Sequence, residues 1–191
     1  MPAPRAAAET PSDKARALQG SCIMAQVIIL CEQDFQDAEV IYPYYRMKEA
    51  GHTVKLAGAG EKQYKGKYGY VLAMDGDIGR FKPDSFDAVI IPGGWAPDYL
   101  RRNSKMVDFV KKMNEKGRIV ASICHGSSLL VSAGMLAGRT MTCFEAVKDD
   151  AIAAGAHYVD RDVVVDRNLI TSRKPDDLPA FCRELLKALE K

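Results

Sequence analysis

The feature that most constrains this fold is a regular alternation between short apolar runs and longer amphipathic segments. We expect buried strands at 25–30, 52–58, 86–94 and 118–123. We expect helices at about 36–50, 103–117 and 126–136. Strands that alternate with helices in this way are typical of parallel βαβ units. The pattern therefore predicts an α/β protein with a doubly wound, mostly parallel sheet sandwiched by helices.

The remaining segments fit the same fold with smaller elements. We expect a hairpin at 67–75, a strand at 139–144, a helix at about 146–154, short strands within 157–172 and a final helix from about Leu178. Residues 1–23 are rich in Ala and Pro and show no strand pattern, which indicates a flexible N-terminal tail before a single domain at 24–191.

Composition excludes several classes of partner. The chain has 191 residues, of which 47% are hydrophobic, enough for one domain with a buried parallel sheet. A net charge of +2 gives no indication of nucleic acid or of an anionic membrane as partner, and no apolar run has the length needed to span a bilayer.

The cysteines indicate reduced, cytoplasmic thiols. There are five, at positions 22, 31, 124, 143 and 182. Their odd number and the absence of a CxxC pair argue against a disulfide framework or a metal site. No glycine-rich nucleotide fingerprint follows the first strand, and we expect no cofactor.

Three loops follow the predicted buried strands, and polar residues gather in them. Ligands of doubly wound sheets bind outside the carboxyl ends of the strands, where the strand order reverses. The loops at 31–37, 92–98 and 124–128 leave such ends, so we expect a site where they meet.

Cys124 is the strongest candidate for chemistry. It follows a buried strand and immediately precedes a helix, as a residue at a nucleophile elbow does. The amides and dipole of a helix start favour a thiolate, so we expect a lowered pKa. The alternative is a structural, buried cysteine, which we accept for Cys22, Cys143 and Cys182. Cys31 stays open, either as a core residue or as part of the same pocket.

The neighbours of Cys124 supply candidate acid, base and oxyanion groups. His125 is adjacent in sequence, so we expect its ring to point away from the sulfur while acting on a substrate. The backbone N–H groups of Gly93, Gly94 and His125 are candidates to hold a developing oxyanion. Trp95 either forms a wall of the pocket or faces a partner subunit.

Glu39 is the candidate carboxyl group. It lies four residues before Pro43, which cannot donate a hydrogen bond to the Glu39 carbonyl, so we expect a distorted helix there. Near a thiol in a partly dry pocket its pKa would be raised. The alternative is a solvated glutamate at a helix N-terminus.

At this point the chain resembles the ThiJ/PfpI superfamily, most closely its PfpI-like branch. The resemblance rests on "DFQDAEVIYPYYRMKEAGH", "FDAVIIPGGWAPDYLR", "GRIVASICHGSSLLVSAGMLAGR", "VKDDAIAAGA" and "ITSRKPDDLPAFCRELL", which follow the family order. It implies a flavodoxin-like fold, a homodimer or higher homo-oligomer, Cys124 as nucleophile, and roles for Glu39 and His125. It also implies that Asp98 reaches the histidine of a neighbouring subunit. Many relatives carry an acidic residue where this chain has Gln36.

The resemblance and the residues allow three functions. The first is a cofactor-independent glyoxalase III or deglycase that acts on methylglyoxal or its protein adducts, with Cys124 as nucleophile and Glu39 moving protons. The second is an intracellular cysteine peptidase that uses His125 and Asp98. The third is a redox sensor or chaperone in which Cys124 is oxidised without turnover. Hydration of a small electrophile such as an isocyanide is a further option.

Overall fold

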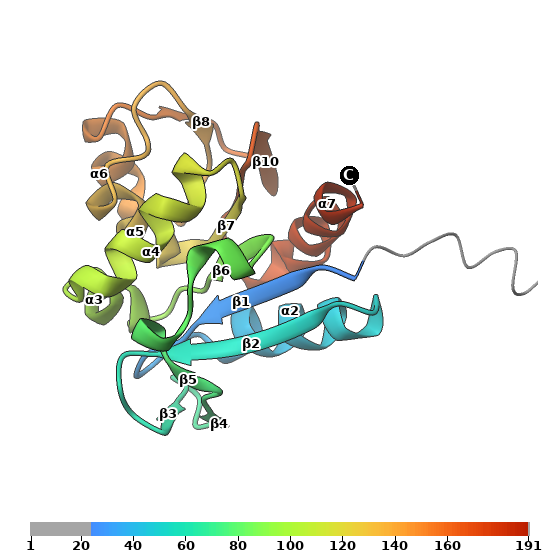
Figure 1. Ribbon diagram of the computed structural model, residues 1–191. Helices are drawn as coiled ribbons and strands as arrows, with labels where there is room; N and C mark the ends of the chain where they lie inside the picture. Colours follow the sequence, from blue (N-terminus) through green and yellow to red (C-terminus); the bar gives the residue numbers. More distant parts are fainter. Residues whose placement is uncertain (1–23, 191) are drawn as a thin grey trace, which may run out of the picture.

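Figure 1 presents the computed structural model of the chain, in which residues 24–190 are described. The predicted tail at 1–23 and Cys22 lie outside the described residues. A seven-stranded sheet forms the centre of the molecule. Its strands are β1 (Gln26–Leu30), β2 (Thr53–Gly58), β5 (Gly76–Asp77), β6 (Ala88–Ile91), β7 (Ile119–Ile123), β10 (Val163–Asp166) and β11 (Leu169–Ser172).

The strand order is that of a doubly wound sheet. The order is β10-β11-β7-β6-β1-β2-β5, and every pair is parallel except β10 with β11. β1 pairs with β2 on one side and with β6 on the other, so the strand order reverses between β1 and β6. The prediction of a mostly parallel, doubly wound sheet is confirmed.

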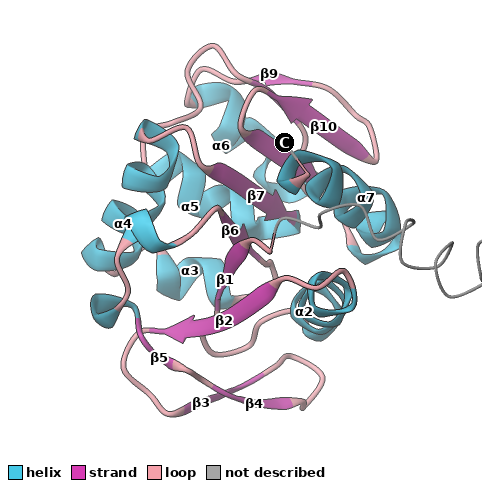
Figure 2. Ribbon diagram, turned by 45° about the vertical axis from the view of Figure 1, so that its right-hand side comes forward, coloured by secondary structure: helices cyan, strands magenta, loops and turns pink. Residues whose placement is uncertain are grey.

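Helices cover both faces of the sheet. They are α2 (Asp37–Glu49), α3 (Ala96–Leu100), α4 (Ser104–Glu115), α5 (Ser127–Ser132), α6 (Lys148–Ala153) and α7 (Leu178–Leu189). Figure 2 shows α2 and α7 together on one face and α3 to α6 on the other. Each face has its own apolar core, because the side chains of a buried strand point alternately to the two sides.

α4 illustrates how the sequence produces these helices. The side chain of Asn103 accepts a hydrogen bond of 3.0 Å from the N–H of Lys105 and so caps the helix start. Met106, Phe109, Val110 and Met113 are buried, at the spacing that places them on one helix face; the expectation for 103–117 holds.

Two predicted elements differ from the structure. The segment at 139–144 contains only the short strand β8 (Thr140–Met141), which pairs with β9 (His157–Tyr158) in a separate small sheet. The N–H of Thr142 donates instead to the side chain of Thr171, and the chain leaves the strand pairing there. The predicted helix at 126–136 ends at Ser132, because Gly134 adopts a left-handed conformation with φ +65°.

Two further expectations concern the hairpin and α2. β3 (Gln63–Lys65) and β4 (Val71–Ala73) form an antiparallel hairpin that starts slightly earlier than the predicted segment at 67–75. α2 continues through Pro43 without a break, so the expected distortion around Glu39 does not interrupt the helix.

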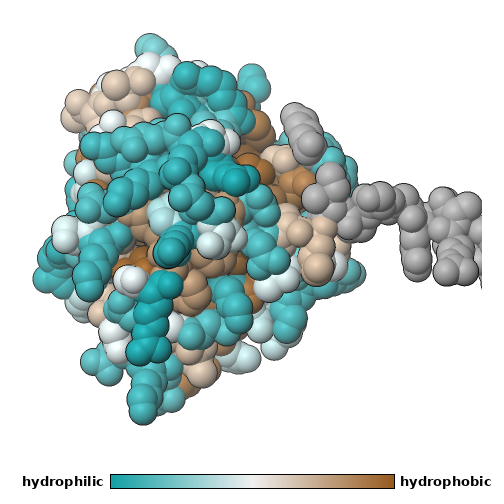
Figure 3. All heavy atoms as spheres, viewed as in Figure 1, coloured by the Kyte–Doolittle hydropathy of each residue, from teal (hydrophilic) through white to brown (hydrophobic). Residues whose placement is uncertain are grey.

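Polar side chains cover most of one face of the molecule (Figure 3). On the face that Figure 3 shows, hydrophilic side chains form most of the surface and hydrophobic ones are visible between them. Within residues 24–190, no helix is both long and apolar enough to cross a bilayer.

Candidate active site

The three predicted loops meet at the point where the strand order reverses. The loop after β1 is joined to the loop after β6 by an isolated bridge between Phe35 and Gly94. The N–H of Gln36 also donates to the carbonyl of Gly93 at 3.1 Å. β7 lies next to β6 and brings Cys124 to the same edge of the sheet. The predicted convergence of the loops is therefore confirmed.

Cys124 occupies a strained turn. It follows β7 directly, begins a single 3₁₀ turn over Cys124–Gly126, and adopts φ +61°. A non-glycine residue rarely adopts this left-handed conformation, and such strain is common where a side chain must be presented for chemistry. Gly126 makes the turn possible, because a Cβ atom there would lie 2.5 Å from the carbonyl oxygen of Ile91.

The pKa of the Cys124 thiol differs from the prediction. Burial raises it to about 12, and the negative charge of Glu39 acts in the same direction. The backbone N–H groups of His125 and Gly94 face the sulfur and lower the pKa, as the sequence suggests, but their effect is smaller. The expectation of a lowered pKa is therefore wrong, since a thiol with 7% of its residue exposed loses most of the solvation that a thiolate needs.

Glu39 faces the thiol from the inner side of α2. Its side chain is fully buried, and its Oε2 atom accepts a hydrogen bond of 2.6 Å from the N–H of Gly93. Its Oε1 atom has no hydrogen-bond partner among the described residues. Burial raises the pKa of Glu39 to about 7, although the Gly93 amide, Cys124 and Lys67 lower it. The predicted rise is confirmed, and the carboxyl group can gain or lose a proton near neutral pH.

Gly93 has a different role from the predicted one. Its N–H group binds Glu39 and is not free to hold an oxyanion. Its missing side chain matters more, because a Cβ atom would lie 2.7 Å from the Cβ of Cys124 and 2.8 Å from Oε2 of Glu39. The amides of Gly94 and His125 are the ones that face the sulfur.

His125 points toward the sulfur, contrary to the prediction. Its Nδ1 atom lies 3.3 Å from the Sγ of Cys124. The left-handed turn at Cys124 changes the usual relation between adjacent side chains and brings them together. Burial lowers the pKa of His125, and Asp98 opposes this effect. A neutral imidazole at this distance can accept the thiol proton.

The other predicted residues surround this centre. The centroid of the Trp95 ring lies 6.4 Å from the centroid of the His125 ring. Trp95 and Asp98 line a cavity of about 500 Å³ with Asp34, Tyr99, Arg101 and Arg102. Asp98 is exposed and influences His125 of its own chain through its charge. Gln36 contributes its backbone, since its N–H holds Gly93 and its carbonyl accepts from the N–H of Glu39 at 3.0 Å.

Two residues of the site were not among the candidates. The ring of Phe144 stacks on His125 at 4.8 Å between centroids, and its N–H donates to the carbonyl of Cys124 at 3.3 Å. Lys67, in the turn between β3 and β4, places its Nζ atom 5.6 Å from the centre of the Trp95 ring. Phe144 is the last residue of the run "RTMTCF", and an aromatic residue at the end of an expected strand was the available signal.

The other described cysteines belong to the core. Cys31 is fully buried, and burial raises the pKa of its thiol. It packs with the apolar side chains beneath α2. The structure therefore supports Cys31 as a core residue and not as part of the pocket of Cys124. Cys143 and Cys182 are buried as expected.

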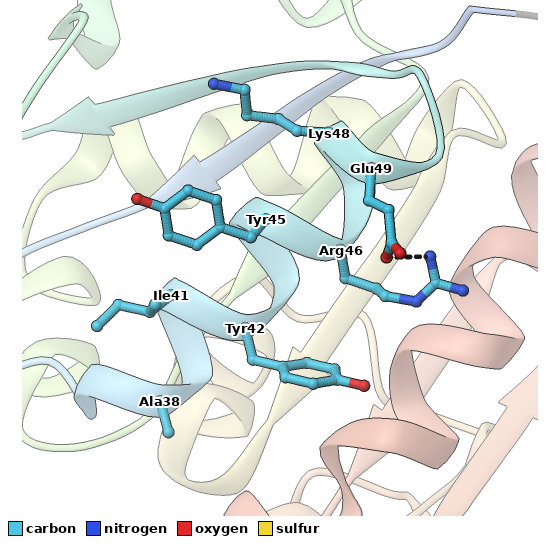
Figure 4. Close-up of a pocket in the computed structure, with 7 residues that line it drawn as sticks. All are labelled: Ala38, Ile41, Tyr42, Tyr45, Arg46, Lys48 and Glu49. Atoms are coloured by element: carbon cyan, nitrogen blue, oxygen red, sulfur yellow. Dashed lines mark hydrogen bonds and ion pairs between the residues drawn. The ribbon is translucent and has the colours of Figure 1, made fainter.

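A hollow on the outer face of α2 is separate from this centre. It is lined by Ala38, Ile41, Tyr42, Tyr45, Arg46, Lys48 and Glu49 (Figure 4). Glu39 lies on the buried side of the same helix, and none of the predicted site residues lines the hollow. Among residues 24–190, no group of three or more His, Cys, Asp or Glu side chains has an arrangement that could hold a metal ion.

Comparison with known sequences places the chain among relatives of similar length. The sequence profile of the DJ-1/PfpI family matches residues 25–188. The chain is 44% identical over 165 residues to Deglycase PfpI of Pyrococcus furiosus, covering 86% of this chain and 99% of that protein. It is 41% identical to Protein/nucleic acid deglycase 2 of Escherichia coli, covering 86% and 97%. It is 38% identical to Putative cysteine protease YraA of Bacillus subtilis, covering 86% and 98%.

Solved structures agree with the sequence comparison. A two-domain protein from Anabaena variabilis, with DJ-1/ThiJ/PfpI-like and ferritin-like domains, is 43% identical with a TM-score of 0.85; the match covers 86% of this chain and 48% of that one. DJ-1beta of Drosophila melanogaster is 25% identical with a TM-score of 0.83, covering 88% and 91%. The fold is thus the flavodoxin-like α/β fold that the resemblance implies. By its sequence profile, its relatives and its fold, the chain belongs to the DJ-1/PfpI family.

Proposed function

We propose that the protein is a cysteine-dependent enzyme that acts on reactive carbonyls such as methylglyoxal or their protein adducts. The observation that carries this proposal is the position of Cys124 between the Nδ1 atom of His125 and the buried carboxyl group of Glu39. The names of its relatives support the proposal, since two of those described above are called deglycases.

The first step is attack of the sulfur on an aldehyde carbon. Because the thiol of Cys124 is protonated at neutral pH, it needs a base at the moment of attack. His125 accepts the proton at Nδ1 as the S–C bond forms and the carbonyl π bond breaks. The same proton then passes to the new oxygen, which gives a hemithioacetal. The amides of Gly94 and His125 face the sulfur, and we expect them to stabilise the negative charge that develops on this oxygen.

The second step moves a proton between neighbouring carbon atoms. The Glu39 carboxylate takes the proton from the former aldehyde carbon, which leaves an enediolate, and returns it to the next carbon, while the hydroxyl proton of the former aldehyde carbon passes to the neighbouring oxygen. The product is a thioester of Cys124. Water cleaves the thioester, restores the thiol and, for methylglyoxal, releases lactate. A pKa of about 7 suits Glu39 to both halves of this transfer, and its Oε1 atom is free to carry the proton.

A substrate panel tests this proposal. Purified protein is incubated with methylglyoxal, a methylglyoxal-modified peptide and the same peptide unmodified, and products are followed by NMR. We expect lactate from the first two and no cleavage of the third. Glu39→Gln should reduce lactate formation at least a hundredfold, as expected for loss of a general base. Absence of lactate from both carbonyl substrates would contradict the proposal.

A second candidate, a cysteine peptidase, is favoured by one observation. The Cys124–His125 distance of 3.3 Å and the charge of Asp98 near the imidazole provide a nucleophile, a base and an acidic neighbour. Hydrolysis of an unmodified peptide that disappears in His125→Ala and survives in Glu39→Gln would favour this candidate. Hydrolysis that persists in His125→Ala would point to a contaminating protease.

A further inference from the structure

Lys67 is held beside the active site by a turn whose backbone is firmly attached. The turn connects β3 and β4, and the hairpin is attached to the loop after β1, where the N–H of Asp34 donates to the carbonyl of Lys65 at 2.8 Å. The N–H of Lys67 donates to the carbonyl of Phe35 at 2.8 Å. The buried carboxylate of Asp37, at the start of α2, accepts from the N–H groups of Tyr68 and Tyr70 at 2.9 and 3.0 Å. The turn is thus fastened to the helix that carries Glu39.

The ammonium group of Lys67 has no acidic partner among the residues that the structure describes. Among residues 24–190, no carboxylate oxygen lies within 4.0 Å of its Nζ atom. The group lies 5.6 Å from the centre of the Trp95 ring and 5.7 Å from that of Tyr68. A cation over the faces of aromatic rings keeps its charge available for an incoming anion. Trp95 in turn adjoins His125, so this cation belongs to the Trp95 side of the active site.

The electric field of Lys67 reaches both proton-transfer groups. Its charge lowers the pKa of Glu39 and that of His125. Asp98 raises the pKa of His125 and so opposes the effect of Lys67 there. A substrate held near Glu39 and His125 therefore experiences the positive charge of Lys67. The affinity of the site for a substrate therefore increases when the substrate carries a negative charge on the side of Lys67.

We propose that Lys67 is a specificity-determining residue for α-oxoaldehydes that also carry a carboxylate. Lys67 attracts the carboxylate of such a substrate, and the aldehyde group contacts the sulfur of Cys124. Such a substrate is methylglyoxal extended by a carboxymethyl group, known chemically as dioxovalerate. This assignment deepens the proposed function and, as regards turnover, rests on it. The electrostatic part of the claim can be tested without any turnover.

The test uses two alkylating reagents of nearly equal size. Iodoacetate is an anion and iodoacetamide is neutral, and the sulfur displaces iodide from each with formation of an S–C bond. The rate at Cys124 is measured by mass spectrometry of the corresponding peptide for wild type, Lys67→Met and Lys67→Glu. Lys65→Met is the matched control, because Lys65 is exposed and lies two residues earlier on the same hairpin.

We expect the iodoacetate-to-iodoacetamide rate ratio to fall on the order of fivefold in Lys67→Met and further in Lys67→Glu. The ratio should stay unchanged in Lys65→Met, and the effect in the Lys67 variants should shrink at high salt. An equal ratio in wild type and Lys67→Met would overturn the proposal. A comparable fall in Lys65→Met would also overturn it, since it would assign the effect to overall charge.

Turnover separates this proposal from the proposed function. In Lys67→Met we expect the KM for dioxovalerate to rise on the order of fivefold, with little change in the KM for methylglyoxal. If neither compound is consumed by wild type while the alkylation ratio changes as expected, the proposed function fails and the anion preference of the site stands. If both compounds are consumed and the two KM values change equally, the anion preference fails and the proposed function stands.

Discussion

The Oε2 atom of Glu39 lies 2.6 Å from the backbone nitrogen of Gly93, which joins the helix after β1 to the loop after β6. This hydrogen bond fixes the carboxyl group beside Cys124. It depends on the absence of a side chain at residue 93, because a Cβ atom there would meet Cys124, Glu39 and the amide of His125 within 3 Å.

Gly93→Ala should therefore abolish activity by displacing the catalytic groups. We expect at least a hundredfold loss in kcat/KM for methylglyoxal and a lower melting temperature. Gly117→Ala is the matched control. Unlike Gly93, Gly117 has a positive φ of +68°, and a Cβ atom there would meet nothing within 4 Å. This control should lose about 1 kcal/mol of stability and keep its activity. Full activity in Gly93→Ala would contradict the geometry.

The strained turn at Cys124 predicts an unusual order of stability between two inactive variants. Both Cys124→Ala and Cys124→Gly remove the sulfur, but only glycine adopts φ +61° without a steric penalty. The glycine variant should therefore be more stable than the alanine variant by about 1 kcal/mol. Denaturant unfolding of the two proteins measures the difference. A more stable alanine variant would show that the turn relaxes or is not strained.

The raised pKa of Glu39 predicts how stability changes with pH. Between pH 4.5 and about 7 the folded protein keeps the Glu39 proton while the unfolded chain has lost it. The folded state thus binds more protons, and stability falls as pH rises through this range. The difference between 4.5 and about 7 corresponds to about 3 kcal/mol.

Glu39→Gln isolates this effect because the amide keeps the shape without the charge. The variant should lose less stability than wild type between pH 4.5 and pH 7.5, which chemical denaturation at a series of pH values measures. Parallel curves for the two proteins would mean that Glu39 ionises with an ordinary pKa.

Reagents should discriminate among the cysteines of the core and the active site. Cys31 and Cys182 are fully buried and Cys143 is 1% exposed, while Cys124 is 7% exposed. We expect dilute peroxide to oxidise Cys124 first among the four described cysteines. Peptide mapping by mass spectrometry checks this order. Equal oxidation of Cys31 and Cys124 would contradict it.

Much of the fold could be predicted from the sequence because its signals are local. The buried strands read as continuous apolar runs, and α4 shows both a cap and a periodic apolar face. The run at 139–144 misled the prediction because its apolar character is real, while its hydrogen-bond partner is a side chain from β11, distant in sequence. Which strand pairs with which depends on such long-range contacts.

The site could be predicted in part for the same reason. The converging loops follow from the general rule for doubly wound sheets. The orientation of His125 could not be predicted, since it depends on a left-handed turn at a residue other than glycine. The pKa of Cys124 could not be predicted, because it depends on how many atoms cover the sulfur and on the charge of Glu39, which lies on another element. Lys67 could not be predicted either, because it lies in the turn of a hairpin whose sequence has no feature that indicates contact with the site.

The proposed function requires the sulfur of Cys124 to be the reacting atom. Initial rates of lactate formation from methylglyoxal by wild type, Cys124→Ala and Cys143→Ala test it most directly, because the last variant removes a buried thiol outside the proposed centre. We expect background rates for Cys124→Ala and near-normal rates for Cys143→Ala. Lactate formation by Cys124→Ala at the wild-type rate would contradict it.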